Sequence, residues 1–121
     1  MTVSYHDVQT FLESFKIKLD IWGIIFRDDR GKNFQTLLDL DIKPNDRVAI
    51  LKQINVEDFV EGPMEDTLYR NSDMWVFGKD VKGEEVYIKI SIGRENQHTL
   101  CVSFHIAEHV LNYPFRNQYK Q

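Results

Sequence analysis

Two stretches near the C-terminus alternate between apolar and polar residues, and this pattern constrains the fold more than any other feature. In the first stretch every second residue is apolar, namely Val86, Ile88, Ile90 and Ile92. The second stretch repeats the pattern with Leu100, Val102 and Phe104. Successive side chains of a strand point to opposite faces, so the pattern predicts strands over residues 86–92 and 99–105 with one buried face each.

A third strand is predicted over residues 74–80, upstream of the alternating stretches. Gly83 and Gly93 lie between the three segments, at positions where short turns are expected. Consecutive strands joined by short turns are typical of an antiparallel meander. The apolar row of each strand then requires a cover on one face of the sheet.

The N-terminal half has helical periodicity that supplies this cover. Ser4 is a good N-cap, and apolar residues follow it at helical spacing, namely Val8, Phe11, Leu12, Phe15 and Leu19. Further helices are expected to end near Asp41 and to open near Pro44. We therefore predict an α+β fold over residues 1–121, in which an antiparallel β-sheet meander is packed on one face by N-terminal helices.

Four other segments carry weaker signals. Residues 21–27 are ambiguous, although their β-branched and aromatic side chains favour a short buried strand. Gly62-Pro63 is expected to break the chain ahead of a polar loop over residues 64–73. Residues 106–111 are expected to form a short helix that Pro114 ends. Phe115 is expected to anchor the last segment, and residues 117–121 to form a frayed tail.

Composition excludes several classes of protein. The chain is 42% hydrophobic and 28% charged, which suits a folded domain, and it contains no apolar run near the roughly 20 residues of a membrane span. Its start lacks the pattern of a signal peptide, and the single cysteine cannot form an internal disulfide, so we expect a cytoplasmic protein. The net charge of −4 means that any contact with nucleic acid requires a local positive patch.

The polar row of the two alternating strands is the first candidate site. It contains Tyr87, Lys89, Ser91, Cys101, Ser103 and His105. A hairpin centred near Glu95 would place Tyr87 opposite Ser103, Lys89 opposite Cys101 and His105 near Glu85. A bulge would shift this register.

These side chains suit the cleavage of RNA without a metal. That reaction needs a base for the 2′-hydroxyl, a cation for the phosphoryl charge and an acid for the leaving oxygen. His105 can transfer protons, Lys89 can supply the charge, and Tyr87 can donate a hydrogen bond or stack on a base. The alternative is that Tyr and Lys on the outer face of a sheet serve solubility alone.

A second constellation combines Cys101, His105 and His109, which are ligand types that zinc accepts. Cys101 and His105 would lie about 13 Å apart on an extended strand at about 3.3 Å per residue. They cannot share one ion at that distance, so no metal site is predicted.

Three stretches resemble the toxins of the MqsR type, which are bacterial RNA interferases of type II toxin–antitoxin modules. They are Met74-Trp75-Val76-Phe77-Gly78-Lys79, Glu85-Val86-Tyr87-Ile88-Lys89-Ile90 and Val102-Ser103-Phe104-His105-Ile106-Ala107-Glu108. The segments Leu38-Asp39-Leu40 and Val56-Glu57-Asp58-Phe59 resemble the helical part of that family. The similarity extends from about residue 5 to 105.

The resemblance implies a RelE-like α+β fold and ribosome-independent cleavage of mRNA without metal or cofactor. It also implies a partner, an antitoxin that carries a DNA-binding domain. Tyr87 and Lys89 match a strand tyrosine and lysine of the family, and His105 stands where its type member has a lysine. Val60-Glu61 stands in place of a Tyr-Lys pair, and Val76 in place of a glutamine.

We therefore expect an endoribonuclease in which His105 is the general acid or base, Lys89 stabilises the phosphoryl charge and Tyr87 positions the substrate. Further candidates for substrate binding are Lys79, Arg94, Ser103, Glu108 and Arg116. Local positive charge is expected from Lys79, Lys82, Lys89 and Arg94. The acidic composition keeps open a non-catalytic module that binds a basic protein, and a structural domain without chemistry is a third hypothesis.

Overall fold

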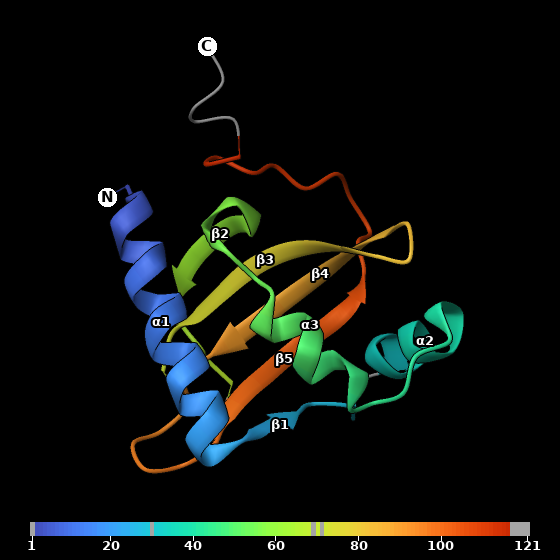
Figure 1. Ribbon diagram of the computed structural model, residues 1–121, viewed down its shortest axis with the longest axis horizontal. Helices are drawn as coiled ribbons and strands as arrows, with labels where there is room; N and C mark the ends of the chain where they lie inside the picture. Colours follow the sequence, from blue (N-terminus) through green and yellow to red (C-terminus); the bar gives the residue numbers. More distant parts are fainter. Residues whose placement is uncertain (1, 30, 69, 71, 117–121) are drawn as a thin grey trace.

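In the computed structural model, which describes residues 2–29, 31–68, 70 and 72–116, three α-helices and a five-stranded mixed sheet form an α+β fold (Figure 1). The helices are α1 (Tyr5–Trp22), α2 (Gly31–Leu40) and α3 (Asp46–Lys52), and a 3₁₀ turn η1 covers Val56–Asp58. The strands are β1 (Ile24–Phe26), β2 (Phe59–Met64), β3 (Met74–Val81), β4 (Glu84–Ser91) and β5 (Thr99–Ile106).

The first helix begins where the sequence predicts it. Ser4 Oγ accepts a hydrogen bond from the Asp7 backbone N–H at 3.1 Å, and the Asp7 carboxylate accepts one from the Ser4 N–H at 3.0 Å. This reciprocal pair satisfies two of the free N–H groups at the helix start. The helix continues to Trp22 and ends at Gly23, which has a φ of +78°. The predicted strand over residues 21–27 is therefore reduced to the three residues of β1.

The sheet has the order β1-β5-β4-β3-β2. β3, β4 and β5 form the predicted antiparallel meander, but β1 pairs with β5 in parallel, so the whole sheet is not a pure meander. β2 pairs with β3 at the opposite edge and contains Gly62 and Pro63. The predicted break there was wrong, because an edge strand tolerates a residue without an N–H group. The loop begins one residue later than predicted.

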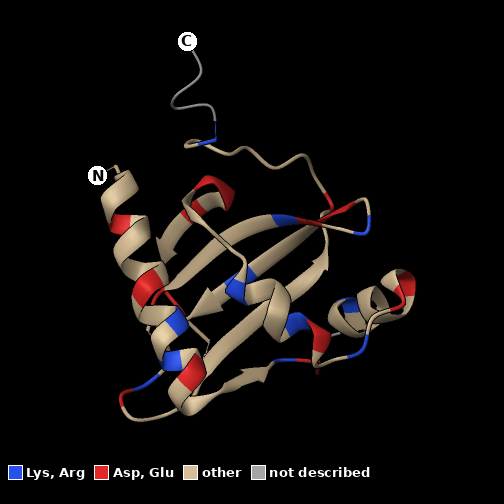
Figure 2. Ribbon diagram, viewed as in Figure 1, with Lys and Arg blue, Asp and Glu red and all other residues tan. Residues whose placement is uncertain are grey.

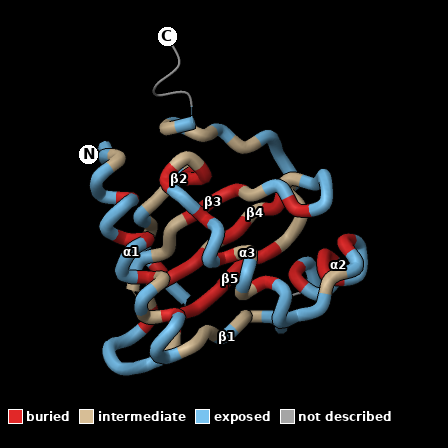
Figure 3. Tube along the Cα trace, viewed as in Figure 1, coloured by how far each residue is buried: buried red, intermediate tan, exposed pale blue. Residues whose placement is uncertain are grey.

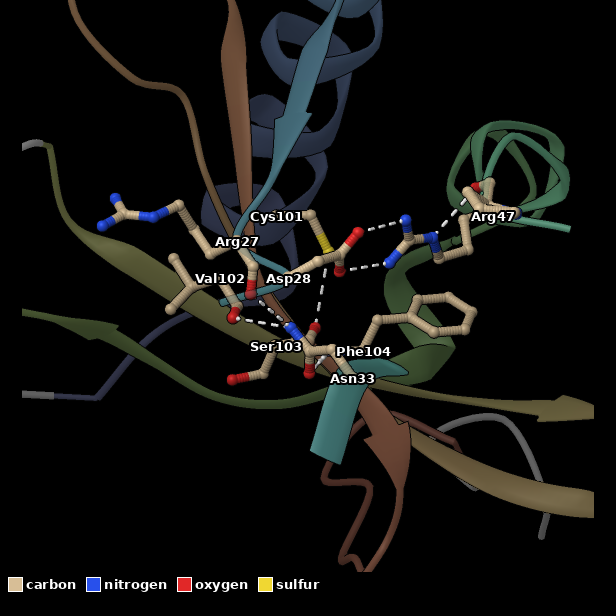
Figure 4. A network of polar contacts seen from close by, with 9 residues as sticks. Arg27, Asp28, Asn33, Arg47, Cys101, Val102, Ser103 and Phe104 are labelled. Atoms are coloured by element: carbon tan, nitrogen blue, oxygen red, sulfur yellow. Dashed lines mark hydrogen bonds and ion pairs between the residues drawn. The ribbon is translucent and has the colours of Figure 1, made fainter. Parts of the chain in front are cut away.

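β1 pairs only with residues 99–101 of β5, and helix α2 forms hydrogen bonds with the rest of that edge. Asn33 Nδ2 donates to the Val102 carbonyl at 3.3 Å, and Asn33 Oδ1 accepts from the Phe104 N–H at 3.0 Å (Figure 4). Thr36 Oγ1 accepts from the Ile106 N–H at 3.1 Å. Asn33 and Thr36 are both buried. Two side chains of a helix therefore satisfy backbone groups that a longer edge strand would otherwise pair.

The core lies between the sheet and the helices, where the buried segments of β3, β4 and β5 pass behind α1 and α3 (Figure 3). The predicted apolar row of β4 faces this core through Val86, Ile88 and Ile90, each fully buried. Ile92 lies beyond the strand and is only partly buried. Burial of such side chains contributes about 1.5–3 kcal/mol each.

Arg47 on α3 is buried in this core, and the sequence pattern did not predict it. Its side chain is 1% exposed, and its guanidinium donates to both carboxylate oxygens of Asp28 at 2.8 Å (Figure 4). Nε donates to the Pro44 carbonyl at 2.9 Å, and the guanidinium lies 3.7 Å from the centre of the Phe26 ring. The buried charge is therefore paired, hydrogen-bonded and stacked.

The chain after β5 returns along the sheet without the predicted helix over residues 106–111. β5 continues to Ile106, and the Ala107 N–H donates to the Glu85 carbonyl at 2.8 Å. Phe115 anchors the segment as predicted, because its ring packs against Tyr5 and Phe59 with centroids 5.9 and 5.6 Å away. The predicted tail at residues 117–121 lies outside the described residues. No described helix is long and apolar enough to cross a membrane.

Candidate functional site

The register of β4 and β5 differs from the predicted one by two residues up to the pair of Lys89 and Ser103, and by one residue beyond it. Tyr87 pairs with His105, Lys89 pairs with Ser103, and Ile90 pairs with Cys101. A bulge on β5 lies between the last two pairs and leaves Val102 without a partner. The extra residue in β5 reverses the direction of every side chain before it relative to those after it.

The bulge separates Cys101 from the polar row in which the sequence placed it. Cys101 pairs with Ile90 and belongs to the core cluster, whereas Leu100 pairs with Ser91 on the outer face. Burial raises the pKa of the Cys101 thiol to about 12. The group is therefore a neutral, buried thiol, and it lies on the opposite face of the sheet from Ser103 and His105.

The three predicted catalytic side chains meet on the outer face of the sheet. The rings of Tyr87 and His105 are stacked, with centroids 5.1 Å apart and 15° between their planes. Lys89 Nζ lies 5.9 Å from the centre of the Tyr87 ring. All three residues are partly exposed. The arrangement places a phenol, an imidazole and an ammonium group on one surface, and of the three only Tyr87 and His105 line a cleft.

The hydrogen bond of His105 defines its tautomer. Nδ1 lies 3.0 Å from the carbonyl oxygen of Ile106. A carbonyl oxygen only accepts hydrogen bonds, so Nδ1 must carry the proton in this contact. The neutral imidazole therefore has its lone pair on Nε2, and that atom can take a proton from a substrate.

Tyr87 is held in its protonated form. Burial raises the pKa of its phenol, and the negative charge of Glu61 raises it further. The hydroxyl group is therefore a hydrogen-bond donor across the neutral pH range, and its ring is a surface against which His105 is oriented.

A cleft of about 370 Å³ opens over this pair. Tyr87 and His105 line it together with Val60 and Glu61 of β2 and with residues 108–112 of the C-terminal segment. Sequence reasoning missed Val60 and Glu61 as cleft residues because β2 itself was not predicted. The only signal was the departure from the resembled family at these two positions.

Glu108 lies at the rim of the cleft and is paired with α2. Its carboxylate accepts a hydrogen bond from Lys32 Nζ at 2.9 Å, and this bond lowers the pKa of Glu108. Glu108 is therefore ionised and is suited to binding rather than to proton donation. His109, the next residue, also lines the cleft and adds a second imidazole to it.

The C-terminal wall of the cleft is held by Tyr113. Its hydroxyl donates to Glu85 at 2.6 Å, and an added Cβ at Gly78 would collide with Tyr113 and Leu111. The guanidinium of Arg116 lies 3.6 Å from the centre of the Tyr113 ring. Gly78 thus provides the space in which the segment crosses β3.

Four of the five expected substrate-binding residues do not line the cleft. Lys79 is on the helix-covered face, where it donates to Asp58 at 2.9 Å. Arg116 also contacts Asp58, at 3.4 Å, and does not line the cleft. Arg94 lies in the turn between β4 and β5, at the far end of β5 from His105. Ser103 is on the correct face, beside Lys89, but is buried.

The expected source of positive charge is therefore only partly present. Lys82, at the β3–β4 turn, donates to the Asp41 carbonyl, and Lys79 is neutralised by Asp58. On the helical face, acidic and basic residues are interspersed along α1 and α3 (Figure 2). The outer face carries Lys89 and the imidazoles near it.

Within the described ranges, no group of three or more His, Cys, Asp or Glu side chains is placed to hold a metal ion.

No family model, no curated protein and no solved structure matches the chain.

Proposed function

We propose that this chain is a metal-independent endoribonuclease that cleaves mRNA by acid–base chemistry in the cleft over Tyr87 and His105. The observation that carries the proposal is the Nδ1 contact of His105, which leaves Nε2 as a basic atom in a residue that lines the cleft. An imidazole with an unprotonated ring nitrogen is a side chain suited to proton transfer.

The reaction begins with a 2′-hydroxyl of RNA. His105 Nε2 takes its proton, the 2′-oxygen forms a bond to the adjacent phosphorus, and the bond from phosphorus to the 5′-oxygen breaks. The products are a 2′,3′-cyclic phosphate and a 5′-hydroxyl. Lys89 stabilises the charge on the phosphoryl oxygens, and Tyr87 donates a hydrogen bond. His109 is the second imidazole in the cleft and the candidate donor to the leaving oxygen.

Within this proposal the chain is the toxin of a type II toxin–antitoxin module with a RelE-like fold. The resemblance of residues 74–79, 85–90 and 102–108 to MqsR-type toxins supports it, as does the α+β arrangement of a meander covered by helices. The implied partner is an antitoxin with a DNA-binding domain. A neighbouring reading frame for a small DNA-binding protein that neutralises the growth arrest caused by this chain would test that part.

The nuclease test uses purified protein, end-labelled mRNA and EDTA. The parent is expected to yield fragments that end in 2′,3′-cyclic phosphate, and RNA with deoxyribose at the cut positions is expected to stay intact. His105→Ala and Lys89→Ala are expected to lose cleavage. His6→Ala, which removes an exposed imidazole on α1, is the matched control and is expected to cleave like the parent. Undiminished cleavage by His105→Ala would contradict the site.

The second candidate is a non-catalytic module that binds a basic protein, and the net charge of −4 favours it. It predicts no cleavage of any RNA and a stoichiometric complex that dissociates as salt is raised. Size-exclusion chromatography of the chain with its partner at two salt concentrations separates this candidate from the nuclease.

A further inference from the structure

A second cavity, of about 290 Å³, lies at the other end of β5. Its lining includes three basic side chains, Arg27, Arg94 and His98. Among the described residues that line it, none is Asp or Glu. A small concave surface with two guanidinium groups and an imidazole is suited to a phosphate group, because guanidinium groups bind phosphate oxygens with paired hydrogen bonds.

The cavity lies on the same face of the sheet as the Tyr87 cleft. Leu100, which lines it, pairs with Ser91, and Ser91 has the same parity along β4 as Lys89 and Tyr87. On β1, Ile24 and Phe26 pack against the core, so Ile25, which also lines the cavity, points to the outer face. The bulge at Val102 is what brings Leu100 to this side.

The turn that carries Arg94 is held in place from several directions. Lys18 on α1 donates to the backbone carbonyls of Ile92 and Arg94. The Gly93 N–H donates to Ser72 and Ser91 at 2.9 and 3.1 Å. Gly93 has a φ of +79° and lies against the His98 carbonyl, where a Cβ would collide. Arg94 and His98 are therefore presented by a fixed turn, which lowers the entropic cost of binding an anion.

The two cavities are separated by a length that suits one RNA strand. Leu100 and His105 pair with Ser91 and Tyr87, which lie four residues apart on the regular strand β4, or about 13 Å at about 3.3 Å per residue. A stacked strand advances about 3.4 Å per nucleotide, so about four nucleotides cover that distance. Lys89, opposite Ser103, lies between the two ends.

We infer that Arg27, Arg94 and His98 form a subsite for a backbone phosphate of the RNA strand whose cleaved bond lies at His105. The inference rests on the proposed function for the identity of the strand, but binding at this subsite does not require cleavage. The subsite adds affinity for longer RNA and explains how an acidic protein can hold a polyanion through one local patch.

The test measures the binding of uncleavable 2′-O-methyl oligonucleotides of three and eight nucleotides by fluorescence anisotropy. The parent is expected to bind the longer one more tightly. Arg27→Gln with Arg94→Gln is expected to weaken binding of the eight-nucleotide strand by about ten- to thirtyfold at 0.1 M salt, and to lower its salt slope by about 0.7, the value for one phosphate. Binding of the three-nucleotide strand is expected to stay unchanged.

Lys43→Gln with Lys52→Gln is the matched control, because it removes two exposed cations from the helical side of the molecule. It is expected to bind both strands like the parent. Arg94→Gln alone changes one exposed turn position, so it keeps the test valid if the double variant misfolds. It is expected to give about half of the decrease in salt slope.

Two results would overturn the subsite: equal affinity of the parent for both lengths, or an unchanged affinity and salt slope in the Arg27→Gln, Arg94→Gln variant. These results are independent of the nuclease assay. A parent that binds the long strand through Arg94 but cleaves no RNA supports the subsite and contradicts the proposed catalysis.

Discussion

The imidazole of His105 is stacked on the phenol of Tyr87, its direct partner across β4 and β5, with ring centroids 5.1 Å apart. The two rings lie on the outer face because Tyr87 and His105 belong to the part of the β4–β5 pairing that the bulge leaves regular. The bulge at Val102 changes the side-chain direction only on its N-terminal side, where it turns Cys101 into the core. One inserted residue thus separates a reactive outer row from an inert buried thiol.

The His105 imidazole is expected to provide the proton transfer. In His105→Gln, the amide can keep a contact with the rest of the cleft but cannot take a proton, so cleavage should fall by about 10²- to 10⁴-fold. The dissociation constant for an uncleavable RNA should change little. Single-turnover cleavage and anisotropy measure the two quantities separately. A variant that loses affinity and cleavage in the same proportion would show that His105 only binds substrate.

Tyr113 is expected to make the stability fall at alkaline pH. Burial and the hydrogen bond to Glu85 raise the pKa of its phenol well above its ordinary value of 10.0. The unfolded chain therefore loses this proton at a lower pH than the folded chain does. Stability is present below about pH 10 and decreases as the pH rises above that value.

Tyr113→Phe removes this titration together with the bond to Glu85. The variant should be less stable than the parent at pH 8, but its stability should fall less between pH 8 and pH 10.5. Urea unfolding midpoints at the two pH values measure the difference. An equal decrease in both proteins would assign the alkaline loss to other groups.

The ion pair of Arg47 and Asp28 is expected to be essential to the core. Asp28→Ala leaves a guanidinium that is 1% exposed without its counter-charge, so the free energy of unfolding should fall by about 3 kcal/mol. Arg47→Met with Asp28→Leu removes both charges, and it should recover much of that loss because a buried pair stabilises little over apolar side chains. Chemical denaturation compares the three proteins, and a double variant no more stable than Asp28→Ala would contradict this account.

Gly78 is expected to determine the position of the C-terminal wall. A Cβ at this position collides with Tyr113 and Leu111, so Gly78→Ala should displace residues 111–113 and speed the hydrogen exchange of the segment after β5. RNA cleavage should fall as the cleft loses that wall.

Gly31→Ala is the matched control for this substitution. Nothing lies within 4 Å of an added Cβ at Gly31, the first residue of α2, so its exchange and cleavage should match the parent. Protected exchange in Gly78→Ala would mean that the segment accommodates the methyl group.

Local sequence signals predicted much of the architecture. The capping pair of Ser4 and Asp7 and the helical spacing after it describe α1, because both depend on residues within a few positions of one another. The alternation through Val86 and Ile88 identified β4 and its buried face for the same reason. The choice of Tyr87, Lys89 and His105 as a cluster followed from this parity.

Other features depend on contacts between distant segments. β2 has no strong pattern of its own and exists because β3 offers an edge with unpaired backbone groups. In the sequence, Arg47 resembles an ordinary surface arginine. Its burial depends on Asp28 and Phe26, which lie far from it in sequence and contact its guanidinium. The cleft requires β2 and the C-terminal segment together, so it cannot be predicted from any single stretch of sequence.

The sequence by itself determined α1, the three strands of the meander and the apolar face of β4, since these follow from periodicity within one element. Only the tertiary structure decided the register of β5, the bulge at Val102 and the meeting of Arg27 with Arg94. The first two depend on how β5 pairs with β4, and the third on the pairing of β5 with β1, which lies 75 residues earlier in the sequence. The free energy of such pairing is shared among many weak contacts that no local pattern records.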